Sequence, residues 1–464
     1  MEHTSSNNQG SRFGNWLKTS ITARMLMVGL LIVVLLIPLA YIKSLIAERA
    51  GRQQEVITEI NEKWGEEVLI YGPILKVPYK TYVETTYTDQ ETKKVHTERK
   101  EKIKYGYFFP ESLDIMGSVH PEPKSRGIYT TAVYQSESTL TGTFANLDFT
   151  EESVAAEDIV WDKARMIIKT SNLKGVNDEV AVNINANRYP FSSVYEGNKN
   201  QNNYYNPDFV QMHTLRSIAL KEADSPKERS IRFSIDLNVN GSKQIRFIPI
   251  GKETTANLTS NWKTANFIGE FLPVNPDKIT DEGFNAKWKV LDLNRPFAQQ
   301  TFNYLPDLNE YASGVNFMIP VDEYQKSERS AKYGFLVIAL TFLIFFLIQT
   351  LSKISIHPFQ YLMIGLALTM FYTLLISISE HSSFLKAYLI AGVAVILLIT
   401  LYSRSILKNI KFPMFILVSL SALYAFIFTI IQLESYALLV GSLGLFFILA
   451  IVMYVSRKID WQNG

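Results

Sequence analysis

The chain has 464 residues, with 46 Lys plus Arg, 44 Asp plus Glu and no cysteine. The net charge of +2 argues against nucleic-acid binding, and the lack of cysteine excludes disulfides, thiolate metal sites and a cysteine nucleophile. Residues 333–464 carry only ten charged side chains, whereas residues 47–332 carry 35 basic and 40 acidic ones. This contrast excludes a simple soluble protein and indicates one part in lipid and another in water.

Six segments are long and apolar enough to cross a bilayer, which takes about 20 residues. They are residues 25–42, 333–351, 358–379, 387–403, 412–433 and 435–456. We read the first as an uncleaved anchor, because its apolar run exceeds that of a signal peptide and no small-residue cleavage pattern follows it. Pro38 predicts a kink within this span.

Basic residues in the short flanks predict the direction of the spans. Nine lie on one side, against Lys386 alone on the other. The nine are Arg12, Lys18, Arg24, Lys353, Arg404, Lys408, Lys411, Arg457 and Lys458. We therefore expect both termini in the cytoplasm and residues 47–332 in the periplasm.

Residues 43–64 have apolar side chains at helical spacing, from Ile46 to Trp64, and Gly65 is a plausible stop. This pattern predicts that the first membrane helix continues outward and packs a stripe against the following domain.

Beyond Gly65 the apolar residues alternate with polar ones, which is typical of strands with one buried face. Residues 231–239, 180–186 and 284–290 show this clearly, and Lys100, Lys102 and Lys104 share one face of another strand. Asn240-Gly241 predicts a hairpin turn between residues 231–239 and 245–247. The polar stretch 198–206 is expected to be a loop.

The expected fold class is a mixed membrane protein, with six transmembrane helices (one plus five) and a large, mostly antiparallel β domain inserted after the first. The expected parts are a cytoplasmic tail (1–24), the first membrane helix (25–46), a periplasmic β-rich domain (47–332), a five-helix membrane domain (333–456) and a second cytoplasmic tail (457–464). Strand order does not follow from the pattern.

Catalytic signatures are missing. The sequence has no nucleophile elbow, phosphate-binding loop, dinucleotide fingerprint or zinc-protease motif, and no two histidines stand three or four residues apart. His96, His120 and His213 could meet only through folding. We expect no enzyme activity, no cofactor and no metal. At the outer end of the third span, Glu380 and His381 are either interfacial anchors or a contact with the β domain, responsive to pH through the histidine.

One long run of residues resembles the CreD family of inner-membrane proteins. It comprises Ile356-His357-Pro358-Phe359-Gln360-Tyr361, Gly365-Leu366-Ala367-Leu368, Phe371-Tyr372 and Ser377-Ile378-Ser379-Glu380-His381. Outside the spans, Gly72-Pro73-Ile74-Leu75, Gly269-Glu270-Phe271-Leu272-Pro273, Leu293-Asn294-Arg295 and the segment from Pro320 to Tyr333 fit the same family.

The resemblance implies a bacterial inner-membrane protein linked to cell envelope integrity and to the response to envelope stress, including β-lactams and colicins. It carries over no catalytic residues. Candidate functional residues at the membrane edge are His357, Pro358, Tyr361, Glu380, His381 and Arg329.

The expected partners are the lipid bilayer and an envelope component or membrane protein, but no nucleic acid. The leading interpretation is non-catalytic binding by the β domain. Alternatives are a transporter or flippase built by the C-terminal helices, and a membrane-bound enzyme with carboxylates and hydroxyls converging in the β domain. A sensor is disfavoured, because only a short segment follows the last span.

Overall fold

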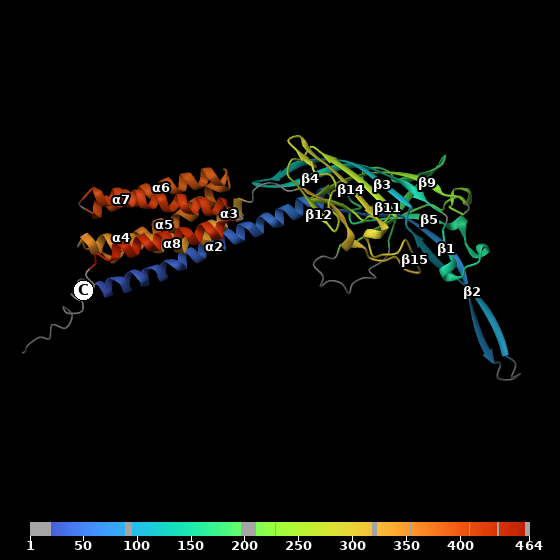
Figure 1. Cartoon of the computed structure of the whole chain (residues 1–464), viewed down its shortest axis with the longest axis horizontal. Coiled ribbons are helices and arrows are strands. Elements are labelled where there is room, and N and C mark those ends of the chain that lie inside the picture. The colour runs from blue at the N-terminus through green and yellow to red at the C-terminus, as the bar shows by residue number, and fades with distance from the viewer. Residues whose placement is uncertain are drawn as a thin grey trace, which may run out of the picture. The chain divides into compact units, whose positions relative to one another are not determined.

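A computed structural model describes residues 20–88, 95–145, 147–195, 210–227, 229–317, 323–352, 354–407, 409–433 and 436–459. The chain divides into two compact units (Figure 1). One is helical and comprises Met1–Glu55 with Val321–Gly464; the other, Val56–Pro320, is rich in strands. The expected loop at 198–206 lies outside the described residues.

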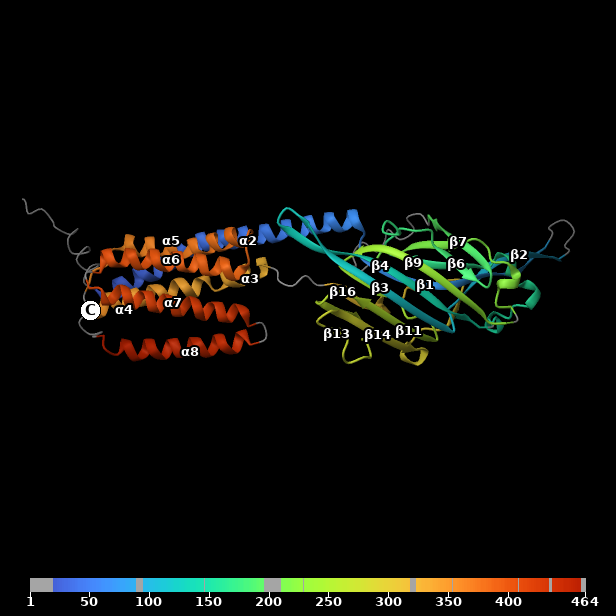
Figure 2. The ribbon, with the colours of Figure 1, turned by 90° about the horizontal axis from the view of Figure 1, so that it is seen from above.

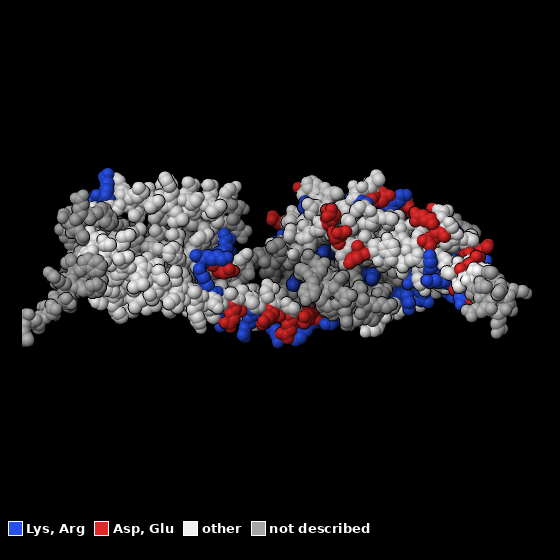
Figure 3. All heavy atoms as spheres, turned by 90° about the horizontal axis from the view of Figure 1, so that it is seen from below, with Lys and Arg blue, Asp and Glu red and all other residues white. Residues whose placement is uncertain are grey.

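The helical unit contains six helices that are long and apolar enough to span a membrane, one N-terminal and five C-terminal. They are α2 (Ile21–Trp64), α4 (Gly334–Ser352), α5 (Pro358–Ser379), α6 (Phe384–Ile406), α7 (Lys411–Gln432) and α8 (Ala437–Ser456). The short polar helix α3 (Glu323–Lys332) precedes α4. The one-plus-five arrangement with a β domain between confirms the predicted fold class. Figure 3 shows few charged side chains over most of the helical unit and many over the β unit.

Helix α2 continues from the apolar segment to Trp64, as the spacing predicts, and runs through Pro38 without a break. Gly65 follows with φ of +148°, a conformation that favours glycine, which confirms the predicted stop. Ile60 is buried and Trp64 half-buried. The indole N–H of Trp64 donates to the Tyr134 carbonyl at 3.4 Å, so the last turns of α2 do pack on the β unit.

Close helix packing surrounds Gly365 of α5. A Cβ at this position would overlap the Leu35 side chain of α2 and would come within 3.0 Å of the Phe342 ring of α4. The absent side chain therefore lets three membrane helices approach one another, as small residues do in membrane proteins.

The β unit contains sixteen strands within the described residues. Their bounds are β1 (Val68–Thr88), β2 (Val95–Phe108), β3 (Ser112–Arg126), β4 (Tyr129–Phe144), β5 (Arg165–Thr170), β6 (Ala181–Ile184), β7 (Asn187–Val194), β8 (His213–Ser217), β9 (Ile231–Ser242), β10 (Gln244–Phe247), β11 (Glu253–Ser260), β12 (Ala265–Gly269), β13 (Ile279–Thr280), β14 (Gly283–Leu291), β15 (Gln300–Phe302) and β16 (Ser313–Phe317).

The strands follow one continuous order, β12-β16-β10-β1-β5-β8-β7-β6-β9-β4-β3-β11-β14-β13; off this path, β2 pairs with β1, and β15 pairs with β2. All strand pairs are antiparallel except β1 with β10 and β3 with β11. The sheet curls around a single apolar core, to which residues from both ends of the strand order contribute (Figure 2). The predicted mostly antiparallel β domain is thereby confirmed.

The predicted Asn240-Gly241 hairpin is wrong. Strand β9 continues through both residues to Ser242 and pairs with β4, whereas β10 pairs with β1 and β16. The left-handed turn residue between them is Lys243, with φ of +58°. Position 241 instead requires glycine for packing, because a Cβ there would overlap the Tyr134 ring. A glycine that admits a neighbouring ring and one that makes a turn look alike in the sequence.

Candidate functional site

The membrane-edge carboxylate Glu380 lies where three helices of the helical unit meet. It caps the C-terminus of α5. Arg49 of α2 places its Nε 3.6 Å from the Glu380 carboxylate, and the Tyr324 hydroxyl of α3 donates to it at 3.3 Å. The Glu380 side chain is only 16% exposed, which strengthens its attraction to the guanidinium. The contacts that the structure gives Glu380 thus join α2, α3 and α5.

His381 and Arg329 lie near the same end of the helical unit but make different contacts. His381 is exposed, and its backbone N–H closes the last turn on Ile378. Arg329 of α3 donates from Nη2 to the Leu433 carbonyl, 3.4 Å away, directly after α7 ends. A cation at a helix C-terminus is favoured by the negative end of the helix dipole. Arg329 therefore links α3 to the C-terminal end of α7.

His357, Pro358 and Tyr361 lie at the opposite end of α5, about 33 Å away at 1.5 Å per residue. Pro358 takes a first-turn position, and the His357 ring Nδ1 accepts from the Phe359 backbone N–H at 3.2 Å. The buried Tyr361 hydroxyl donates to Gln349 of α4 at 2.8 Å. These residues cap and pack the helix, so the six predicted candidates form two separate groups.

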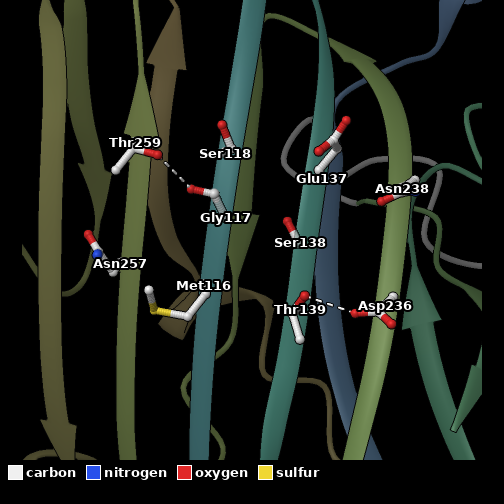
Figure 4. Close-up of a pocket in the computed structure, with 10 residues that line it drawn as sticks. All are labelled: Met116, Gly117, Ser118, Glu137, Ser138, Thr139, Asp236, Asn238, Asn257 and Thr259. Atoms are coloured by element: carbon white, nitrogen blue, oxygen red, sulfur yellow. Dashed lines mark hydrogen bonds between the residues drawn. The ribbon is translucent and has the colours of Figure 1, made fainter.

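A hollow on the outer face of the β sheet is lined mainly by polar side chains (Figure 4). Strands β11, β3, β4 and β9 lie side by side there around a cavity of about 570 Å³. Its lining residues are Met116, Gly117, Ser118, Glu137, Ser138, Thr139, Asp236, Asn238, Asn257 and Thr259. We call this the polar groove.

Strand register arranges the outward side chains of the groove in two rows across the sheet. One row is Asn257, Met116, Thr139 and Asp236, and the next is Thr259, Ser118, Glu137 and Asn238. Leu258 and Leu237 between the two rows, and Ile115, Leu140 and Ile235 next to the first row, are buried in the core. The alternation that buries one face of each strand therefore also assembles the polar groove.

The hydrogen-bonding capacity of the groove is only partly used. The Thr139 hydroxyl donates to Asp236 at 2.9 Å, and the Asn238 amide donates to Asp178 at 2.8 Å. The amide oxygen of Asn257 is inaccessible and has no partner within the described part of the protein. The lining includes two carboxylates, Glu137 and Asp236, but no Lys or Arg. Such a surface suits a hydroxyl-rich, amide-rich or cationic ligand and repels anions.

The structure contains a serine–histidine contact at the groove that the sequence analysis did not predict. Ser118 Oγ lies 3.1 Å from His120 Nε2, because residues two apart share one strand face. A nucleophilic serine needs a base that a third group orients. Within the described residues, no carboxylate makes a hydrogen bond or ion pair with His120, and no group of three or more metal-binding side chains occurs. The arrangement therefore lacks the third member of a catalytic triad.

Comparison with known proteins decides the family. The family model described as "Inner membrane protein CreD" matches residues 20–462. The chain belongs to the CreD family. An inner membrane protein CreD of Escherichia coli (strain K12) is 30% identical over 437 residues, which cover 93% of this chain and 91% of the relative. The resemblance inferred from the membrane and loop motifs is confirmed, and this CreD family member is a multi-pass inner-membrane protein.

Proposed function

We propose that this CreD family protein supports the integrity of the cell envelope by binding an envelope component through its β domain, without catalysing a reaction. The observation that carries the proposal is the polar groove, which offers hydroxyl, amide and carboxylate groups across four strands. The incomplete Ser118–His120 pair supports binding over catalysis. The ligand class that fits is neutral or cationic and rich in hydroxyl or amide groups.

The proposal includes an orientation, with both termini in the cytoplasm and residues 47–332 in the periplasm. The excess of basic residues in one set of flanks supports it. Topology reporters placed after residue 200 and at the C-terminus test it. A periplasmic signal at residue 200 and a cytoplasmic signal at the tail are expected, and the reverse would overturn the scheme.

Site-specific photocrosslinking in living cells tests the binding proposal. A photoreactive residue at Thr139 or Asn238 is expected to capture one envelope component, whereas the same residue at Leu293, which is 89% exposed and outside the groove, is not. Equal capture from the groove and from Leu293 would contradict the assignment. Turnover of a cell-wall or lipid substrate by the purified protein would contradict the non-catalytic part.

Loss of the groove carboxylates gives a second readout. A Glu137→Gln, Asp236→Asn variant is expected to lower tolerance to envelope-damaging agents towards that of a deletion strain. The matched control is a Glu179→Gln, Glu222→Gln variant, which removes two exposed carboxylates elsewhere on the β unit. If both variants behave like the unaltered protein, the groove is not the binding site.

A transporter or flippase built by α4–α8 is the second candidate, favoured by the presence of five helices where one would anchor the domain. In the described parts of these helices, the charged residues Lys386, Arg404 and Lys411 all lie in or next to a terminal turn. Ion coupling needs ionisable groups deeper in the membrane. Reconstituted vesicles that move no lipid, ion or peptide would remove this candidate.

A further inference from the structure

An apolar crevice runs between three membrane helices, α4, α7 and α8. Its volume is about 710 Å³, within the roughly 300–1,000 Å³ range of small-molecule sites. Almost all of its lining is aliphatic or aromatic, from Leu340 to Leu351 on α4, Phe412 to Phe426 on α7 and Gly444 to Val455 on α8. No residue of α8 is buried, so this helix leaves one side of the crevice open.

The crevice matches one leaflet of a bilayer in length. Its lining on α4 extends from Leu340 to Ser352, which is about 18 Å at 1.5 Å per residue, and one leaflet contributes about half of a 30 Å hydrocarbon core. The two polar groups near one end are Ser352, the last residue of α4, and Lys411, the first residue of α7. Apart from Ser419 of α7, the crevice is therefore apolar along its length, and it is polar where the leaflet surface would lie.

Positive charge gathers at that end. Lys411 is exposed and makes no ion pair with any described acidic side chain. Arg457 and Lys458 directly follow α8, whose end lies beside the start of α7 because the two helices are antiparallel neighbours. Helices α4, α7 and α8 contain no acidic residue. Basic groups beside a cleft between membrane helices favour lipids with anionic headgroups.

Gly444 helps to set the shape of the crevice. A Cβ at this position would overlap the Phe426 ring, so the glycine allows α8 to approach α7 along the back of the crevice. From this geometry we propose that the crevice is a binding site for one anionic phospholipid, with an acyl chain between α4 and α8 and the headgroup phosphate at Lys411.

The test uses the full-length protein purified in detergent and analysed by native mass spectrometry. The unaltered protein is expected to retain one phospholipid per chain and, after delipidation, to bind phosphatidylglycerol more tightly than phosphatidylcholine. Ala422→Trp fills the crevice and is expected to abolish retention. Its matched control, Ala425→Trp, adds the same ring to an exposed alanine of α7 that does not line the crevice.

A second variant, Lys411→Gln, keeps the crevice open and is expected to weaken phosphatidylglycerol binding about fivefold. Lys386→Gln, on α6, is its control. The proposal is overturned if the unaltered protein retains no lipid, if both tryptophan variants retain lipid equally, or if the native species is a dimer without lipid whose assembly Ala422→Trp disrupts. Unchanged phosphatidylglycerol binding by Lys411→Gln would overturn the headgroup assignment.

Discussion

Glu59, near the C-terminal end of α2, forms an ion pair with Arg126, the last residue of β3. Lys63, one turn further along the helix, places its Nζ 2.7 Å from the same carboxylate. The hydrogen bond from Arg126, followed by that from Lys63, lowers the pKa of Glu59 from 4.5 to about 2. One exposed carboxylate therefore links the C-terminal end of helix α2 to the β sheet.

The Glu59–Arg126 pair predicts a pH-dependent attachment of the helix end. Because the folded-state pKa is depressed, the stabilisation is present above about pH 4.5 and is lost as the pH falls towards 2. Glu59→Gln is expected to speed hydrogen exchange of residues 56–64 severalfold at pH 7. Exchange that is equally fast in both proteins at pH 7 would contradict the prediction, as would an effect that 1 M salt leaves unchanged.

We expect the buried Asp224 to contribute more to stability than the exposed Glu59–Arg126 pair does. It is 3% exposed and accepts hydrogen bonds from the Tyr189 hydroxyl and from the amides of Asn185 and Asn187, both at 2.7 Å. Burial alone would raise the pKa of Asp224, but these three donors together lower it. Asp224→Ala leaves these three donors without an acceptor and is expected to destabilise the β unit by roughly 3 kcal/mol.

The control for Asp224 is Glu222→Ala, which removes an exposed neighbour paired with Lys227 and should cost about 0–1 kcal/mol. Thermal unfolding of the two variants at pH 7 provides the measurement. If Asp224→Ala lowers the unfolding temperature no more than Glu222→Ala does, the buried hydrogen-bonded cluster contributes little to the stability of the β unit.

The contacts of Arg295 indicate that the stability of the β unit depends on the shape of its guanidinium group as well as on its charge. It is 6% exposed and donates to the carbonyls of Phe297, Ile250 and Gly251 at 2.8–3.2 Å. Burial lowers its pKa to about 10, so it remains charged at neutral pH. Arg295→Lys keeps the charge but loses the planar fork, and we expect a loss of about 2 kcal/mol in unfolding free energy. Lys289→Arg, at an exposed position, serves as the control and should be neutral.

The Arg49–Glu380 pair predicts coupling between α2 and α5 within the helical unit. Glu380→Gln is expected to destabilise this unit by about 1 kcal/mol, because the carboxylate is only partly exposed. A double-mutant cycle with Arg49→Gln measures the interaction by thermal unfolding in detergent. Additive effects of the two substitutions would mean that the pair contributes nothing. Glu328→Gln, which breaks an exposed pair with Lys332, should have a smaller effect.

The parts of the fold predicted correctly depend on local periodicity. The six spans and the strand around Trp288 follow from apolar residues at intervals that match a helix or a strand. Local pattern also placed the end of α2 at Gly65. The span predicted as residues 387–403 extends to Phe384–Ile406, because Lys386 and Arg404 can lie inside a helix while their charged ends reach the membrane surface.

The polar groove and the Asp224 cluster depend instead on contacts between distant segments. Asn257 and Met116 become neighbours only through the parallel pairing of β11 with β3, and nothing in either strand specifies that register. Asn185 and Asn187 reach Asp224 from 39 and 37 residues away. Alternation indicates which face of a strand is polar, but not which strands lie side by side.

The parallel pairing of β1 with β10 bears on the order in which the protein matures. Val68 pairs with Ile245, a separation of 177 residues. Residues 68–70 of β1 can therefore pair with β10 only after residues 245–247 have been synthesised, and the last described strand, β16, then pairs with β10. All the described strands of the sheet precede α4 along the chain. The β unit can thus finish folding while α2 alone holds the nascent chain in the membrane, before the five C-terminal helices are inserted.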